Sequence, residues 1–168
     1  ILENVINAYN GDVNAKAKMS EAAFLSGKAI NISYTTAAHS LSYPLTTLYG
    51  ISHGHAVALT LGSFFVINSN LEDYTINDPR GGDFLESIMK DIFSLFNVKN
   101  GTECKIKFRD MLIHIGLEID LFKIGINNQS DINKIVDNVN LDRLNNNPIK
   151  LNRNDLMKIF TDLMNDKL

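Results

Sequence analysis

The segment HGHAVALTLGSFFVI, residues 53 to 67, restricts the fold most strongly, because it is apolar on nearly every side when wound as a helix. A helix without a polar face is stable only where other elements cover it all round. Ser52 stands directly before it as a predicted N-cap. The longest apolar run, Ala56 to Ile67, falls far short of the roughly 20 residues that span a bilayer. The segment therefore predicts a central, buried helix, and we expect no membrane partner.

Helical periodicity also dominates the sequence on both sides of this segment. No strand-like alternation persists over a useful length, and no glycine-rich motif that cradles a dinucleotide phosphate is present. The stretch from Asn14 to Ile32 mixes small and large apolar residues, which suits close packing against other helices. We predict an all-α fold, a helical bundle, with further helices over residues 1–9, 14–32, 85–96, 102–115, 130–136 and 152–164.

Turn-forming and capping residues divide these helices. Residues 69–83 are rich in turn formers and are predicted to be a loop. Thr102 is predicted to cap one helix, Ser130 to start another, and Asn152 to cap the last one. Gly116 is predicted to end the helix that begins at Thr102.

Two breakers lie between the central helix and the helical stretch before it. Pro44 lacks an N–H, and its ring would clash with the carbonyl group of Ser40, so we predict that the helix breaks or bends between Ser40 and Tyr43. Gly50 is predicted to close the short helical stretch that follows. Together these breaks would fold the chain after Gly50 back toward the residues before Pro44.

Length, charge and cysteine content narrow the class of protein. The 168 residues suit one domain with a sizeable core. A net charge of −3 without a long basic run argues against nucleic acid or an anionic membrane as partner. The single cysteine, Cys104, rules out an internal disulfide and indicates a reducing, cytoplasmic compartment. The chain starts inside an apparent helix without an initiator Met, so we expect it to be part of a larger protein.

Three of the four histidines lie in AAHSLSYPLTTLYGISHGHAVAL, residues 37 to 59. His39 and His53 each stand in an apolar stretch, and a buried imidazole needs a partner for each nitrogen. A divalent metal would supply one partner, with a carbonyl or carboxylate on the other nitrogen. The alternative is a pair of core histidines bonded to the backbone, which is common. Two histidines also leave a catalytic metal short of the usual three or four protein ligands, so further ligands would have to come from elsewhere.

The remaining histidines and the cysteine carry weaker signals. His114 lies opposite the apolar face of its helix and is predicted to be a solvated surface residue. Cys104 lies on the apolar face and is predicted to be a small core residue rather than a nucleophile. His55 lies two residues after His53 and is a candidate catalytic relay or substrate contact.

The segment that holds the histidines resembles the signature of iron-containing (group III) alcohol dehydrogenases. Three further segments are similar to blocks of the same family in the same order: AAFLSGKAINIS, GLEIDLFKIGINNQSDINKIV and NNPIKLNRNDLMKIF. The resemblance implies the all-α C-terminal domain of the dehydroquinate synthase-like, iron-containing alcohol dehydrogenase fold over residues 1–168. It also implies that the dinucleotide-binding N-terminal domain, which would be this domain's partner, lies outside this chain.

The resemblance implies a reaction and a set of site residues. His39 and His53 match two metal ligands, and the other two, an Asp and a His, would lie upstream of residue 1. The metal would be Fe(II), with Zn(II) as a substitute, and NAD(P)H would be bound mainly by the missing domain. Tyr43 replaces a second histidine of many members, close to the nicotinamide and to a small aldehyde or alcohol substrate. The fragment alone is expected to be inactive, and its uncovered domain face makes a homo-oligomer an expectation.

Tyr43 and its flanking segments resemble the branch that reduces phosphonoacetaldehyde. Tyr34 stands where that branch is expected to have a lysine, and Lys28 is the nearest cation for a phosphonate. Ser52 replaces the usual proline before the second ligand. Two alternatives stay open: a zinc-dependent relative of glycerol dehydrogenase and dehydroquinate synthase, or a helical module that binds metal or a partner protein without catalysis.

Overall fold

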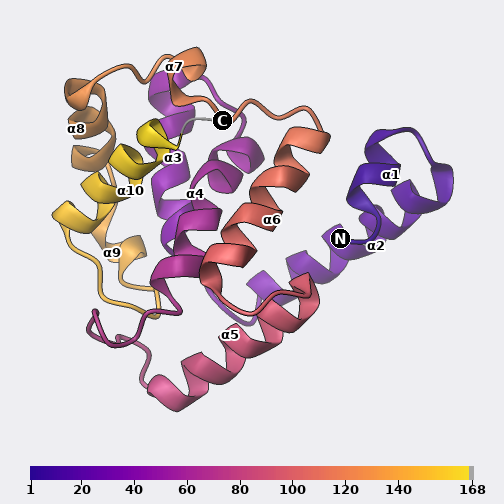
Figure 1. The fold of residues 1–168 in the computed structure, drawn as a ribbon, viewed down its shortest axis with the longest axis horizontal. Helices are drawn as coiled ribbons and strands as arrows, with labels where there is room; N and C mark the ends of the chain where they lie inside the picture. The colour runs from indigo at the N-terminus through magenta and orange to yellow at the C-terminus, as the bar shows by residue number, and fades with distance from the viewer. Residues whose placement is uncertain (167–168) are drawn as a thin grey trace.

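The computed structural model describes residues 1–166, and helices make up its regular structure (Figure 1). Within these residues no β-strand forms, and an isolated antiparallel bridge joins Ile76 to Ile149. The prediction of an all-α fold is confirmed. The helices are α1 (Val5–Tyr9), α2 (Val13–Ile30), α3 (Ala37–Tyr49), α4 (His53–Ile67), α5 (Gly82–Phe96), α6 (Gly101–His114), α7 (Leu121–Ile124), α8 (Gln129–Asp137), α9 (Leu141–Leu144) and α10 (Arg153–Asn165).

Helix α4 packs between α3 and α6 and forms the middle of the molecule (Figure 1). Ala56, Leu59 and Phe64 are buried, whereas His53, in its first turn, is exposed. The prediction of a central buried helix is therefore confirmed for the body of α4. Ser52 occupies the N-cap position with an extended backbone, but its side chain makes no capping hydrogen bond. In the described part of the chain, no helix combines the length and apolar character that crossing a bilayer requires.

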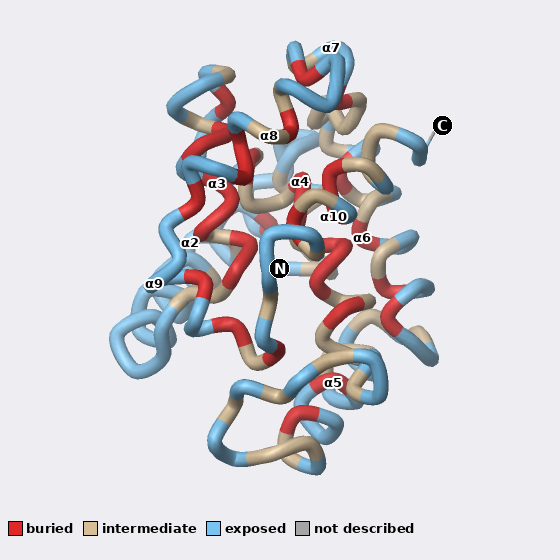
Figure 2. Tube along the Cα trace, turned by 90° about the vertical axis from the view of Figure 1, so that its left-hand side faces the viewer, coloured by how far each residue is buried: buried red, intermediate tan, exposed pale blue. Residues whose placement is uncertain are grey.

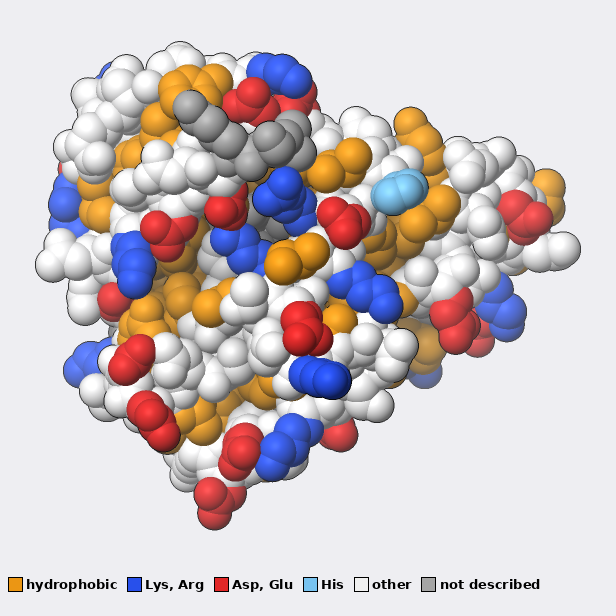
Figure 3. Space-filling view, viewed as in Figure 1, with side chains coloured by type: hydrophobic (Ala, Val, Ile, Leu, Met, Phe, Trp, Pro, Cys, Tyr) orange, Lys and Arg blue, Asp and Glu red, His pale blue; other side chains and the backbone are white. Residues whose placement is uncertain are grey.

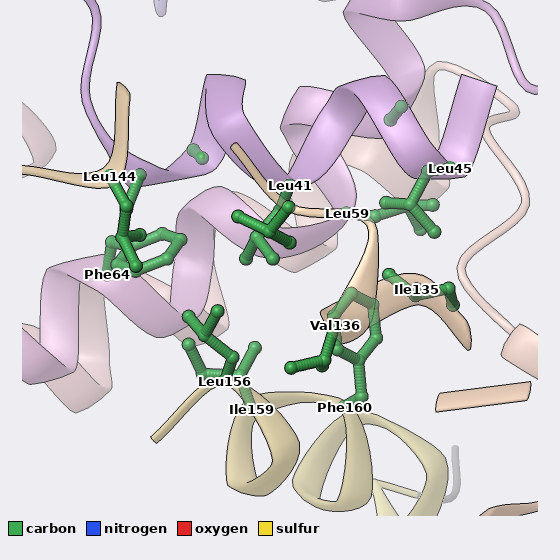
Figure 4. Packing of buried hydrophobic residues seen from close by; sticks show 14 of the residues in the cluster. Leu41, Leu45, Leu59, Phe64, Ile135, Val136, Leu144, Leu156, Ile159 and Phe160 are labelled. Atoms are coloured by element: carbon green, nitrogen blue, oxygen red, sulfur yellow. The ribbon is translucent and has the colours of Figure 1, made fainter. Parts of the chain in front are cut away.

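The main core forms where α3, α4, α8 and α10 meet. Figure 4 shows side chains from these helices, together with Leu144 of α9, pointing into a common interior. Leu41 and Leu45 of α3 and Phe160 of α10 are among its fully buried members. Burying a side chain of this kind stabilises the fold by about 1.5–3 kcal/mol. Because α3 and α4 share one core, the residues at the starts of both helices are held in a fixed relation.

Helix α3 runs without interruption from Ala37 to Tyr49 and contains Pro44. The predicted break between Ser40 and Tyr43 is therefore wrong, and the alternative of a bend there stays a prediction. A proline inside a helix costs about 3 kcal/mol through the lost hydrogen bond and the ring clash. Leu41 and Leu45 flank the proline and are completely buried, so tertiary packing of α3 outweighs this local cost. Gly50 ends the helix with φ of 69°, as predicted.

Asparagine side chains cap more helices than the sequence predicted. The side chain of Asn100, not Thr102, caps α6 by accepting a hydrogen bond from the backbone N–H of Glu103. Asn128 caps α8 two residues before the predicted start at Ser130. In both cases the asparagine directly precedes the helix and has an extended backbone, so its amide oxygen reaches the free N–H groups of the first turn. The hydroxyl groups of Thr102 and Ser130 lie inside that turn and are less well placed to accept these hydrogen bonds. The predicted cap at Asn152 is confirmed.

Helices α1 and α2 form an arm that projects from the body of the molecule (Figure 1). Helix α2 packs chiefly on α1, and Ala15 is its buried residue. Phe24 and Leu25 are more than half exposed, at 63% and 55%. The close packing predicted for residues 14–32 is therefore not formed within the described chain. In the space-filling view the arm is the projection at the right, with apolar side chains on its surface (Figure 3).

Candidate metal centre

His39 and His53 lie side by side although fourteen residues separate them. His39 stands in the first turn of α3, and His53 is the first residue of α4. Gly50 ends α3, and the short connection that follows returns the chain until His53 is level with Ser42. The centres of the two imidazole rings are 5.2 Å apart, and the ring planes are inclined by 49°.

This separation fits coordination of one ion by both rings. Metal–nitrogen bonds of about 2.0–2.1 Å with a near-tetrahedral angle put two imidazole centres about 5 Å apart. The two helices that carry the rings are anchored by the core, and Figure 2 marks much of both helices as buried. The position of the rings is therefore set by packing rather than by their own contact.

Ser42 orients the His53 ring. Its hydroxyl donates to the backbone carbonyl of His39 at 2.7 Å and lies 3.1 Å from Nδ1 of His53. Because a serine hydroxyl has one proton, it accepts at the second contact, so Nδ1 of His53 carries the hydrogen and donates. The lone pair of His53 is then on Nε2. A hydrogen bond on the far nitrogen is the usual way in which proteins orient a metal-binding histidine.

The His39 ring makes no hydrogen bond within residues 1–166. Burial, and secondly the neighbouring His53, lower the pKa of His39 below its ordinary value. Both causes favour the neutral imidazole, which is the form that binds a metal. No cluster of three or more His, Cys, Asp or Glu side chains suited to a metal occurs in the described part of the chain. His39 and His53 thus stay candidate ligands, and the supply of further ligands from elsewhere stays a prediction.

Tyr43 lies one helical turn after His39 and belongs to the same cluster. Its ring centre is 5.7 Å from that of His53, and the side chain is 43% exposed. The guanidinium carbon of Arg143, from α9, lies 4.6 Å from the centre of the Tyr43 ring. Arg143 could not be identified from the sequence, because a single arginine in LDRL, far along the chain from the histidines, carries no local pattern.

His55 makes a contact of a different kind. Its Nε2 atom lies 2.6 Å from the backbone carbonyl oxygen of Glu118. Since a carbonyl can only accept, Nε2 carries the hydrogen and donates to it. This bond ties α4 to the segment between α6 and α7. The catalytic role suggested for His55 stays a prediction, and the bond supplies a structural role for the same residue.

The other residues singled out from the sequence lie outside the cluster. Lys28 is on the arm, where its Nζ lies 4.8 Å from the centre of the Phe24 ring. Cys104 is completely buried, and burial raises the pKa of its thiol to about 11, as befits a core residue. His114 is exposed and contacts the backbone oxygen of Asp110 through Nδ1, as expected for a surface histidine.

The chain belongs to the Fe-containing alcohol dehydrogenase family, whose C-terminal region matches residues 1–164. It is 36% identical over 78 residues to a phosphonoacetaldehyde reductase of Streptomyces viridochromogenes, an alignment that covers 46% of this chain and 20% of that protein. It is 33% identical over 61 residues to aldehyde-alcohol dehydrogenase 2 of Entamoeba histolytica, covering 36% and 7%. The resemblance seen in the sequence is confirmed, and the aligned part is a small share of each relative.

Two solved structures have a similar fold. Sulfoacetaldehyde reductase from Bifidobacterium kashiwanohense, in complex with NAD+, superposes with a TM-score of 0.58 and 26% identity, over 79% of this chain and 32% of that chain. An archaeal halo-thermophilic alcohol dehydrogenase from a Red Sea brine pool, ADH/D1, has a TM-score of 0.70 and 21% identity, over 96% and 41%. The second likeness concerns the fold alone. In both cases the chain spans less than half of the relative's length.

Proposed function

We propose that this chain is the metal-binding domain of an NAD(P)-linked aldehyde reductase, in which His39 and His53 hold the metal. The observation that carries the proposal is the pair of imidazoles 5.2 Å apart at the adjacent starts of α3 and α4. Membership in the Fe-containing alcohol dehydrogenase family supports it. Fe(II) suits a set of imidazole and carboxylate ligands without sulfur, and Zn(II) is the second choice.

The residues of this chain have separate tasks in that site. His39 and His53 would each present one ring nitrogen to the ion, and Ser42 holds His53 in the tautomer whose Nε2 is free to bind. The remaining ligands, an Asp and a His, would come from the dinucleotide-binding domain that precedes this one in the family. A bound ion would polarise an aldehyde oxygen, and NAD(P)H would supply the hydride.

Tyr43 lies where it can act on the substrate or the cofactor. Its ring borders His53, and its side chain is partly exposed. The phenol O–H can donate a hydrogen bond to the substrate oxygen, and the ring face can pack against a nicotinamide. His55 donates to the carbonyl of Glu118, so its part in the reaction would be to hold α4 rather than to move a proton.

The substrate that we propose is a short aldehyde with a tetrahedral anionic group, phosphonoacetaldehyde first. The similarity to a phosphonoacetaldehyde reductase over 46% of this chain supports this choice. The fold shared with a sulfoacetaldehyde reductase supports the same class of substrate. Cytoplasmic location and reliance on an N-terminal domain of the family type are part of the proposal.

The test is an assay of the protein encoded by the complete reading frame. It would be reconstituted with Fe(II) or Zn(II) and offered phosphonoacetaldehyde, sulfoacetaldehyde, propanal and glycerol with NADH, NADPH or their oxidised forms. We expect NAD(P)H oxidation with an aldehyde and its loss on chelation of the metal. Glycerol oxidation alone would instead favour a glycerol dehydrogenase, and the absence of all turnover in the metal-loaded protein would overturn the proposal.

A further inference from the structure

Helix α9 carries an arginine to the edge of the histidine cluster. Leu144 of α9 is buried in the common core and fixes this short helix against α3. The Asn140 side chain caps α9 by accepting from the backbone N–H of Arg143 at 3.1 Å. With the backbone anchored in this way, the exposed Arg143 side chain extends over Tyr43, 4.6 Å from the ring centre. The same Tyr43 ring borders His53, with 5.7 Å between the two ring centres, so Tyr43 contacts both Arg143 and the histidine cluster.

Within residues 1–166 no carboxylate pairs with the charge of Arg143. In the described part of the chain, Arg143 has no carboxylate within 4.0 Å, although Arg80 and Arg153 both have one. Arg80 provides the sharpest contrast, because it also lies over an aromatic ring, Phe84, at 3.9 Å. Two of its guanidinium nitrogens bond to the carboxylate of Asp78, at 2.9 and 2.7 Å. The donors of Arg143 therefore remain free for a ligand, whereas those of Arg80 are occupied.

A free guanidinium beside two candidate metal ligands is suited to binding an anion. A divalent ion and a guanidinium together concentrate positive charge at one surface, and such a field attracts negatively charged ligands. A guanidinium binds phosphonate or sulfonate oxygens through two parallel N–H bonds. Contact with the Tyr43 ring limits the rotamers of the long side chain, so less entropy is lost when the anion binds.

We infer that Arg143 recognises the tetrahedral anionic group of the substrate, while the aldehyde end of the same molecule faces His39 and His53. This inference rests on the proposed function and adds the residue that selects anionic aldehydes. It assigns the role to α9 instead of Lys28, whose side chain lies over Phe24 on the arm. Phosphonate and sulfonate share the chemistry that Arg143 would recognise, so the assay must separate the two.

The test compares substrates in variants of the full-length, metal-loaded protein. Arg143→Gln removes the charge, and Arg143→Met removes it but keeps an apolar stem on Tyr43. We expect kcat/KM for phosphonoacetaldehyde or sulfoacetaldehyde to fall about 10- to 150-fold relative to kcat/KM for propanal, the range that loss of a charged hydrogen bond gives. Whichever anionic substrate shows the larger relative loss identifies the natural head group. Arg143→Lys should recover part of the preference.

A binding measurement and a control complete the test. Isothermal titration with 2-hydroxyethylphosphonate, the alcohol formed from phosphonoacetaldehyde, should give weaker binding to Arg143→Gln than to wild type by a similar factor. Arg80→Gln, the matched control, should leave the substrate ratio unchanged. An unchanged ratio in both neutral Arg143 variants overturns the inference while the reductase stands. Failure of the wild-type protein to reduce any aldehyde overturns the proposed function and the inference together.

Discussion

The α1–α2 and α3–α4 pairs are each joined by a connection of three residues, yet they differ in burial. The α3–α4 pair is buried at the centre, with Leu41 and Leu45 wholly inaccessible to solvent. The α1–α2 pair projects as an arm, and Phe24 and Leu25 on it remain mostly exposed. Both pairs carry apolar residues at helical spacing, so spacing alone does not decide burial. What differs is the number of neighbours: α3 and α4 meet α6, α8 and α9, whereas α2 meets chiefly α1.

This difference explains why the candidate site is on α3 and α4. A metal site needs ligands held in a fixed geometry, and a side chain is held best when the backbone beneath it is anchored on several sides. His39 and His53 stand at the starts of helices whose apolar faces pack into the core. An equivalent pair on the arm would depend chiefly on the packing of α2 against α1.

The largest effect that separates the two pairs should be on stability. Leu45→Ala empties a fully buried position, and we expect it to lower the free energy of unfolding by about 2–5 kcal/mol. Leu25→Ala, the same change on the arm, should lower it by no more than about 0.5 kcal/mol. Urea unfolding followed by circular dichroism measures both. Equal losses would mean that the arm is as well packed as the centre.

The next effect concerns metal binding. His39→Ala or His53→Ala, in the full-length protein, should weaken metal affinity at least about 100-fold, because each removes a proposed ligand and not merely a neighbour of one. His114→Ala, a surface change on α6, should leave the bound metal as it is. Metal content after dialysis, measured by elemental mass spectrometry, distinguishes these results. Full metal retention by the two single variants would remove His39 and His53 from the site.

A smaller effect should follow from the orienting hydroxyl. Ser42→Ala frees the His53 ring from its 3.1 Å contact, and we expect a loss of about 10- to 100-fold in metal affinity with little change in fold. Ser26→Ala on the exposed arm is the matched control. Competition with a chromophoric chelator gives the affinities. If Ser42→Ala bound metal as tightly as wild type, the tautomer of His53 would not depend on Ser42.

The smallest effect is a pH dependence of stability from Cys104 in the central body. Burial raises the pKa of this thiol to about 11, so the folded state keeps the proton that the unfolded state loses near its ordinary value of 9.0. The contribution of this thiol to the free energy of unfolding is therefore complete below about pH 9. It is lost as the pH rises toward 11. Cys104→Ala should reduce this slope in urea unfolding, and adding a thiol to the arm by Ser26→Cys should not increase it. If Cys104→Ala and wild type showed the same dependence of the free energy of unfolding on pH, that dependence would come from other groups.

Local patterns determined much of the molecule. Periodicity identifies the helices and the burial of α4, because an apolar surface of that width can only be covered by other helices. Gly50 and Asn152 mark their helix ends through backbone and side-chain chemistry confined to a few residues. The spacing and context of His39 and His53, with the family signature around them, identify both as candidate ligands.

Other features depended on contacts that no local pattern records. Helix α3 continues through Pro44, because the burial of its neighbours outweighs the local cost of the ring. Arg143 meets Tyr43 only because Leu144 docks α9 on α3, and His55 finds a carbonyl that lies 63 positions further along the chain. Local chemistry acts over a few residues and so can be read from the sequence, whereas these pairings arise only when separate helices share one core.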